Sequence, residues 1–115
     1  MIMNSILEDI KQMLNLEKDY TPFDTDVQIY INSAFGNLYQ LGVLTDKYSI
    51  TGYDETWDDV PFVRKQEQEI KVYIYLYTRL RFDPPANSFV IEAIEKQISE
   101  AEWRLNVEAE GAFES

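Results

Sequence analysis

The tripeptide at residues 83–85, Asp-Pro-Pro, interrupts the chain, and no further proline follows it. Proline lacks a backbone donor and pushes the residue before it out of the helical region, so this tripeptide must end any preceding helix. Asn87 or Ser88 can cap a new helix through a side-chain oxygen. Apolar residues then recur at steps of three and four, at Ile91, Ile94, Ile98, Ala101 and Leu105. This spacing predicts an amphipathic helix at residues 88–107, roughly 30 Å long, whose apolar face the rest of the chain must cover.

Two helices are expected near the start of the chain. Ser5 followed three residues later by Glu8 matches a capping box, which predicts that the first helix begins there. Apolar residues at helical spacing predict a second helix at residues 24–41, and Gly42 can end it because glycine accepts the left-handed conformation of a helix C-terminus. The candidate N-caps of the two helices are Asn4 or Ser5, and Asp24 or Thr25.

A third helix is expected at residues 61–82, with Pro61 in its first turn, Asp58 or Asp59 as its cap and Trp57 packed back against it. Residues 72–77, Val-Tyr-Ile-Tyr-Leu-Tyr, have strong β propensity, but the length of the segment and its Lys-, Glu- and Gln-rich flank favour a helix. Such a helix is apolar on nearly every side, so it is expected to be buried on several sides. Core packing is therefore favoured over an interface role for Tyr73, Tyr75 and Tyr77.

These segments together predict an all-α fold, a small bundle of about four helices with a short irregular or β-hairpin insertion between the second and third. The helices at residues 24–41, 61–82 and 88–107 are expected to form the core. Residues 1–107 are expected to be one domain, and residues 108–115 a flexible acidic tail in which Phe113 could anchor a partner.

The chain carries 21 acidic and 10 basic residues and no histidine, for a formal net charge of −11. Gripping DNA requires cations that displace counterions from phosphate, so this balance argues against a DNA-binding surface. If copies of the chain formed a ring, its acidic lumen would let a DNA duplex pass without binding it. Solubility alone explains such a charge equally well. Residues 61–83 form a locally basic segment, with five basic and three acidic residues, between acidic neighbours. Opposite charges on different faces could pair copies head to tail, although pairing within the subunit is favoured for any one residue.

No catalytic constellation emerges. Without histidine or cysteine, the usual serine triad, thiol nucleophiles and thiolate metal sites are excluded. The four carboxylates at residues 54–59 lack the spacing and the glycine of a calcium loop, so helix capping is favoured over metal binding there. The sequence thus predicts a protein without enzymatic activity or cofactor. It shows no signal peptide and no apolar run of membrane-spanning length, so synthesis in the cytoplasm is expected.

Four stretches resemble the head-tail connector (adaptor, or head-completion) family of tailed bacteriophages and prophages. They are RLRFDPP, the helix SFVIEAIEKQISEAEWRLN after it, and the upstream stretches TPFDTDVQIYINSAFGNLYQLGV and SITGYDETWDDV. The resemblance implies a helical structural protein that forms a ring of about a dozen subunits below the portal of a filled head. It further implies docking of the next neck or tail protein on the ring, passage of DNA without specific binding, and residence in the virion neck after assembly in the host cytoplasm.

Candidate contacts with other subunits, the portal or the tail follow from the basic segment and from the tryptophans and tail aromatic. They are Trp57, Arg64, Lys65, Arg79, Arg81, Trp103 and Phe113. Two alternatives remain open on the sequence: an acidic module that mimics DNA and sequesters a basic host protein, and a prophage-encoded helical scaffold unrelated to the neck.

Overall fold

The structure, a computed structural model, describes residues 5–64 and 66–114, with side chains as far as Gly111. The described chain forms four α-helices: α1 (Ile6–Met13), α2 (Asp24–Gln40), α3 (Glu67–Phe82) and α4 (Ser88–Glu114). A short 3-10 turn, η1 (Trp57–Asp59), lies in the long connection between α2 and α3. The described residues contain isolated β-bridges but no strand, so the predicted all-α fold is confirmed.

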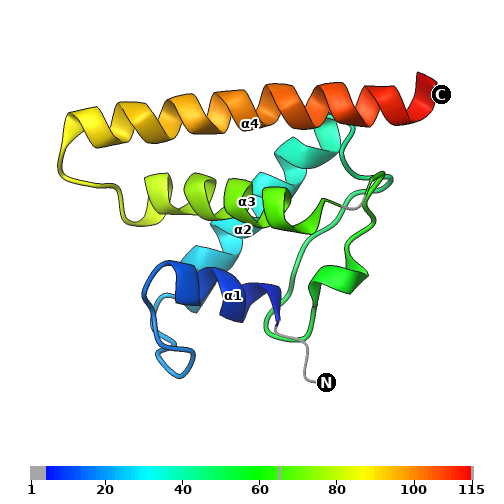
Figure 1. Ribbon diagram of the computed structural model, residues 1–115. Coiled ribbons are helices and arrows are strands. Elements are labelled where there is room, and N and C mark those ends of the chain that lie inside the picture. Colours follow the sequence, from blue (N-terminus) through cyan, green and yellow to red (C-terminus); the bar gives the residue numbers. More distant parts are fainter. Residues whose placement is uncertain (1–4, 65, 115) are drawn as a thin grey trace.

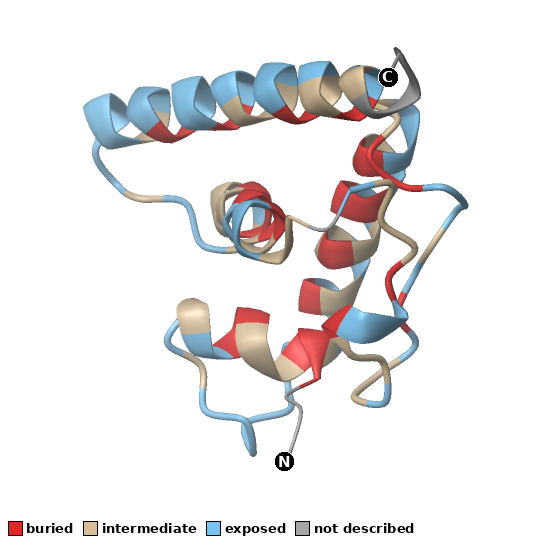
Figure 2. Cartoon of the chain, turned by 45° about the vertical axis from the view of Figure 1, so that its right-hand side comes forward, coloured by how far each residue is buried: buried red, intermediate tan, exposed pale blue. Residues whose placement is uncertain are grey.

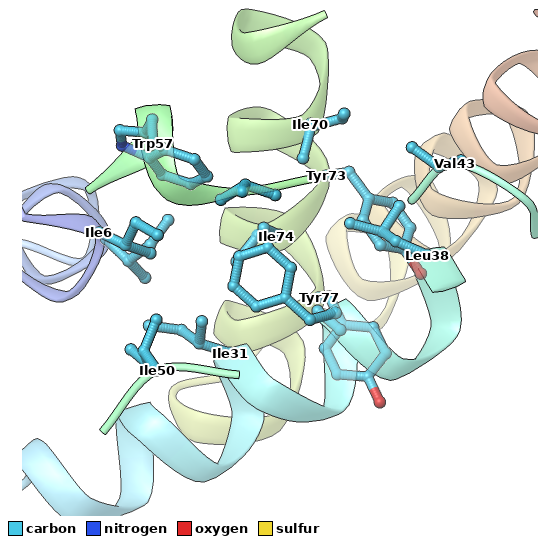
Figure 3. Close-up of a cluster of buried hydrophobic side chains, with 14 of the residues drawn as sticks. Ile6, Ile31, Leu38, Val43, Ile50, Trp57, Ile70, Tyr73, Ile74 and Tyr77 are labelled. Atoms are coloured by element: carbon cyan, nitrogen blue, oxygen red, sulfur yellow. The ribbon is translucent and has the colours of Figure 1, made fainter. Parts of the chain in front are cut away.

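The helices are arranged around α3, which lies between α4 on one side and α1 on the other, while α2 crosses behind it (Figure 1). The core is built from α1, α2, α3, the connection between α2 and α3, and the inner face of α4. Figure 3 shows the part where α1, α2 and α3 meet this connection. Its largest fully buried side chains include Phe35 of α2 and Tyr73 and Ile74 of α3. Full burial of one such apolar side chain contributes roughly 1.5–3 kcal/mol. The first helix thus joins the core, which had been expected from the three later helices alone.

The start of α1 agrees with its predicted cap, because the Ser5 hydroxyl accepts a hydrogen bond of 2.9 Å from the Glu8 amide. The start of α2 differs from expectation. Its N-cap is Phe23, which supplies no side-chain cap, and Asp24 lies inside the first turn. The Asp24 carboxylate instead contacts Lys11 of α1, a stronger charged partner than backbone amides alone. The predicted end of α2 is confirmed, since Gly42 follows it with a positive φ of 82°.

The start of α3 was predicted wrongly, because the helix begins at Glu67 and not at Pro61. The preceding residues pair with the chain after α2: the Thr45 amide donates to the Pro61 carbonyl at 2.8 Å, and the Val63 amide to the Val43 carbonyl at 2.9 Å. A backbone committed to this bridge cannot also form the first turn of a helix. The segment at residues 72–77 is helical, as predicted.

The last helix begins as predicted and extends further. Asn87 caps it, its side-chain oxygen accepting from the Phe89 amide at 2.8 Å. Beyond the end expected near residue 107, α4 continues to Glu114. Two contacts hold the C-terminal half of α4 against the turn after α2: the Asn106 amide group donates to the Leu41 carbonyl at 2.9 Å, and Ala109, beyond the predicted end, is buried beside this turn. The inner face of α4 therefore reaches both α3 and the end of α2.

Candidate interaction surfaces

Lys11 is the most deeply buried charged residue described, with none of its surface exposed. Its ammonium lies 2.7 Å from an Asp24 carboxylate oxygen and donates to the Tyr53 hydroxyl at 2.8 Å. It also donates to the carbonyls of Lys18, at 3.1 Å, and Tyr20, at 2.7 Å. This cation joins α1 to the turn after it, to the start of α2 and to the distant residue Tyr53.

The pKa values of this buried group indicate a structural role. Burial alone would lower the pKa of Lys11, but its contacts with Asp24 and Tyr53 outweigh burial and raise the pKa above the ordinary value. The pKa of Tyr53 is raised as well, by burial and by its hydrogen bond to Asp24. A nucleophilic or basic lysine needs a lowered pKa, so this amine is held in its charged form as a cross-link within the fold.

The outward face of α4 is the most prominent exposed apolar surface. Phe89 is 79% exposed, Trp103 69% and Val107 44%. Figure 2 shows this division along α4, with buried residues on the side facing the body of the subunit and exposed residues on the opposite side. We call the outward residues at alternating steps of four and three the α4 outer face: Phe89, Ala93, Lys96, Glu100, Trp103 and Val107.

A shallow groove of about 330 Å³ lies between α3 and α4 and adjoins this face. Its lining is mostly apolar and includes Val72 and Leu76 from α3 and Ala101 from α4, together with the charged Arg104. The volume is at the lower limit for a small-molecule site, and the groove is only partly enclosed. Its shape fits a side chain from a partner protein better than an enclosed substrate.

A second exposed apolar surface lies across the subunit from α4. Tyr20 and Phe23 are both exposed, their ring centroids are 5.7 Å apart, and Phe23 meets Phe82 edge to face at 5.3 Å. These three residues form what we call the aromatic patch. Tyr20 and Phe23 belong to the turn between α1 and α2, and Phe82 is the last residue of α3. This turn lies on the far side of α3 from α4 (Figure 1). Large aromatic side chains left at the surface are typical of contact sites between proteins.

The candidate contact residues predicted from the sequence are dispersed. Trp103 lies on the α4 outer face. Trp57 is only 4% exposed and donates to an Asp9 carboxylate oxygen at 2.7 Å, so it packs inside the subunit. Lys65 lies outside the described residues, as does the side chain of Phe113.

The predicted arginines do not form one basic patch. Arg64 is exposed in the connection before α3, whereas Arg79 and Arg81 lie in the last turn of that helix, roughly 20 Å further along its axis. Arg79 donates to the Tyr75 hydroxyl at 3.0 Å, and this contact raises its pKa. The Arg81 guanidinium stacks 3.5 Å from the centre of the Tyr77 ring and remains exposed.

The acidic segment at residues 54–59 binds the fold's own backbone. A Glu55 carboxylate oxygen accepts from the Thr51 amide at 2.9 Å, and an Asp59 oxygen from the Thr56 amide at 2.9 Å. Burial would raise the pKa of Glu55, but the hydrogen bonds from Thr51 prevail and lower it. Within the described ranges, no three acidic residues are arranged to hold a metal ion. No helix in these ranges has the length and apolar character needed to cross a bilayer.

Sequence reasoning missed most of the two exposed apolar surfaces. Phe89 and Val107 lie on the same outward side of α4 as Trp103, at helical spacing. This pattern was overlooked because the inward apolar residues follow a stronger one. Tyr20 and Phe23 had no periodic signal, because the turn before α2 brings them together.

Comparison with known proteins identifies the family. The family model described as phage connector protein matches residues 6–112. No curated protein and no solved structure matches the chain. The matched residues run from the start of α1 almost to the end of α4, and so contain every helix described above. The chain therefore belongs to the phage connector protein family.

Proposed function

We propose that this protein is the head-tail connector of a tailed phage, a structural adaptor that forms a ring below the portal. In that position it completes the head and offers the docking surface for the next neck or tail protein. The family match over residues 6–112 carries this proposal. A structural family whose members join virion components needs no catalytic group, so we infer that the protein has no enzymatic activity.

The two exposed apolar surfaces support ring formation. A ring requires a head-to-tail contact, in which two different surfaces of the subunit meet between neighbouring copies. The α4 outer face and the turn between α1 and α2 that carries Tyr20 and Phe23 lie on different sides of α3 (Figure 1), so the subunit has two separate surfaces for such a contact. We propose that they meet one another, or the portal, in the assembled neck.

The charge of the protein supports a passive role toward DNA. At a net charge of −11, a closed ring concentrates negative charge around its lumen, and repulsion keeps a passing duplex from adhering. The alternative of an acidic DNA mimic has no supporting observation. Carboxylates that a mimic would display are used inside the subunit, including those of Asp9, Asp24, Glu55, Asp59 and Glu102.

The proposal is tested by complementation in a phage that lacks this chain. Its heads are expected to fill with DNA and fail to join tails, and the wild-type chain in trans is expected to restore infectious particles containing it. Mutant heads that join tails normally without the chain would contradict the connector role.

One variant tests the aromatic patch. Phe23→Asp removes an aromatic ring and places aspartate at the N-cap of α2, where this residue is favourable, so the fold is expected to tolerate it. We expect this variant to fold and to fail in complementation. Tyr39→Asp, which removes a comparably exposed ring elsewhere on α2, is the matched control and is expected to complement.

A further inference from the structure

The α4 outer face has the spacing of a coiled-coil seam. Its six residues follow one another at steps of four and three from position 89 to position 107, over a length of about 27 Å. All six are exposed, and α4 is the outermost layer on its side of the subunit (Figure 2). Among the described residues, the ion pairs are those of Lys11 and Lys71, so neither Lys96 nor Glu100 has a charged partner there. The seam therefore has no partner helix among the described residues.

The seam is complementary to itself when two copies of α4 run antiparallel. When the two-fold axis crosses the pair of helices level with position 98, Lys96 of each copy lies against Glu100 of the other. This arrangement also sets the small Ala93 against the large Trp103. At the outer ends, Phe89 meets Val107. Each layer thus joins opposite charges, a small and a large side chain, or two apolar side chains, and these are pairings that stabilise a helix interface.

Other registers lose this match. A parallel pair in register would set Lys96 against Lys96 and Glu100 against Glu100, and like charges across a seam are unfavourable. A shift by one heptad in the antiparallel pair would set Glu100 against either Phe89 or Trp103. A charged pair at the centre of a seam commonly fixes strand orientation and register in this way, at some cost in stability.

We propose that a second copy of this chain covers the α4 outer face, forming an antiparallel two-fold dimer through α4 in the unassembled protein. A contact limited to one helix from each copy is at the small end of specific interfaces, so the dimer is weak enough to dissociate. A two-fold contact closes on itself and does not extend into a ring. The dimer itself is independent of the proposed function; that it withholds this face until the neck assembles rests on that function.

A charge exchange tests the proposal directly. Native mass spectrometry of the full chain over a concentration series is expected to show a monomer-dimer equilibrium. Lys96→Glu and Glu100→Lys each replace two attractive pairs per dimer by two repulsive ones, and each is expected to weaken dimerisation about tenfold. The double variant K96E/E100K exchanges the two charges and is expected to restore wild-type dimerisation to within about threefold.

Matched controls separate this contact from general charge effects. Glu95→Lys makes the same substitution as Glu100→Lys at a position rotated about 120° around the helix from the outer face, and it is expected to leave dimerisation unchanged. Circular dichroism checks that each variant keeps its helices. Trp103→Ala provides a second test without a charge change and is expected to weaken the dimer, since it leaves a gap opposite Ala93.

The outcomes distinguish this inference from the connector role. A wild-type protein that stays monomeric at all concentrations, or a double variant no better than the single ones, overturns the α4 dimer. Neither result affects complementation of tail joining, which tests the connector role. Phe23→Asp, expected to fail in complementation, is expected to dimerise as the wild type does, because the aromatic patch lies away from α4.

Discussion

Replacing Lys11 by methionine removes the buried cation on which four groups converge. Methionine has nearly the same length and no charge, so the variant keeps the packing of the side chain and loses its polar contacts. The lost contacts are the ion pair with Asp24 at 2.7 Å, the hydrogen bond to Tyr53 at 2.8 Å, and those to two carbonyls at 2.7 and 3.1 Å. The Asp24 carboxylate is then left without its cation.

The size of the effect follows from the burial of the two partners. Removing one member of a buried ion pair typically costs about 3–5 kcal/mol. Lys11 is fully buried, but the side chain of Asp24 is 19% exposed, and water can reach it in the variant. We therefore expect the lower end of the range, about 3 kcal/mol, which is a large part of the stability of about 5–15 kcal/mol usual for a domain. With an unfolding entropy of about 2.1 cal/mol/K per residue, this loss lowers the Tm by about 12 °C.

Thermal and urea unfolding followed by circular dichroism measure this loss. Lys18→Met is the matched control, because the Lys18 side chain is exposed and only its backbone carbonyl contacts Lys11. It is expected to change the free energy of unfolding by less than about 0.5 kcal/mol. The double variant K11M/D24N is expected to cost at least about 1 kcal/mol less than the sum of its parts. A Lys11→Met variant as stable as Lys18→Met would refute the reasoning.

Three further predictions concern two contacts between distant segments and the pH dependence of stability. Tyr73→Phe removes the hydrogen bond of 2.7 Å between the buried Tyr73 hydroxyl and Glu102 of α4, and it is expected to lower the free energy of unfolding by about 1 kcal/mol in urea titrations. Asn32→Ala leaves both the amide and the carbonyl of Ile50 without their side-chain partner, at 2.7 and 3.0 Å, and it is expected to cost about 2 kcal/mol and to speed amide hydrogen exchange at Ile50. Burial raises the pKa of Tyr48 to about 12 and also raises that of Tyr73. Both folded-state pKa values lie above the ordinary value of 10, so the folded state is favoured while the two tyrosines are neutral. This contribution to stability is complete below about pH 10 and is lost as the pH rises further. The Tm is therefore expected to fall above about pH 10. A Tm independent of pH between 9 and about 12 would contradict this sign.

The helices were predictable where local rules decide them. The Ser5 cap, the stop at Gly42 and the restart at Asn87 depend on neighbouring residues only, and each lies where the sequence places it. The inward stripe of α4 likewise has a period that packing against the body of the subunit requires.

Features that depend on distant residues could not be predicted. α3 begins later than predicted because the chain near Pro61 pairs with Thr45, a contact that helix propensity does not reveal. Asp24 was expected to cap α2, but the fold brings Lys11 to it. Trp57 was expected to pack back against the third helix and was also a candidate partner contact, but it is buried inside the subunit, where its indole N–H donates to Asp9 of α1. In each case the partner lies more than a dozen residues away along the chain.

The central claim is that this chain acts as a ring-forming connector on the portal. Native mass spectrometry of the purified chain mixed with portal complexes tests it most directly. We expect a portal complex whose added mass is a whole number of subunits forming one closed ring, and no such complex with Phe23→Asp. Portal complexes of unchanged mass at saturating concentrations of the wild-type chain would contradict the account.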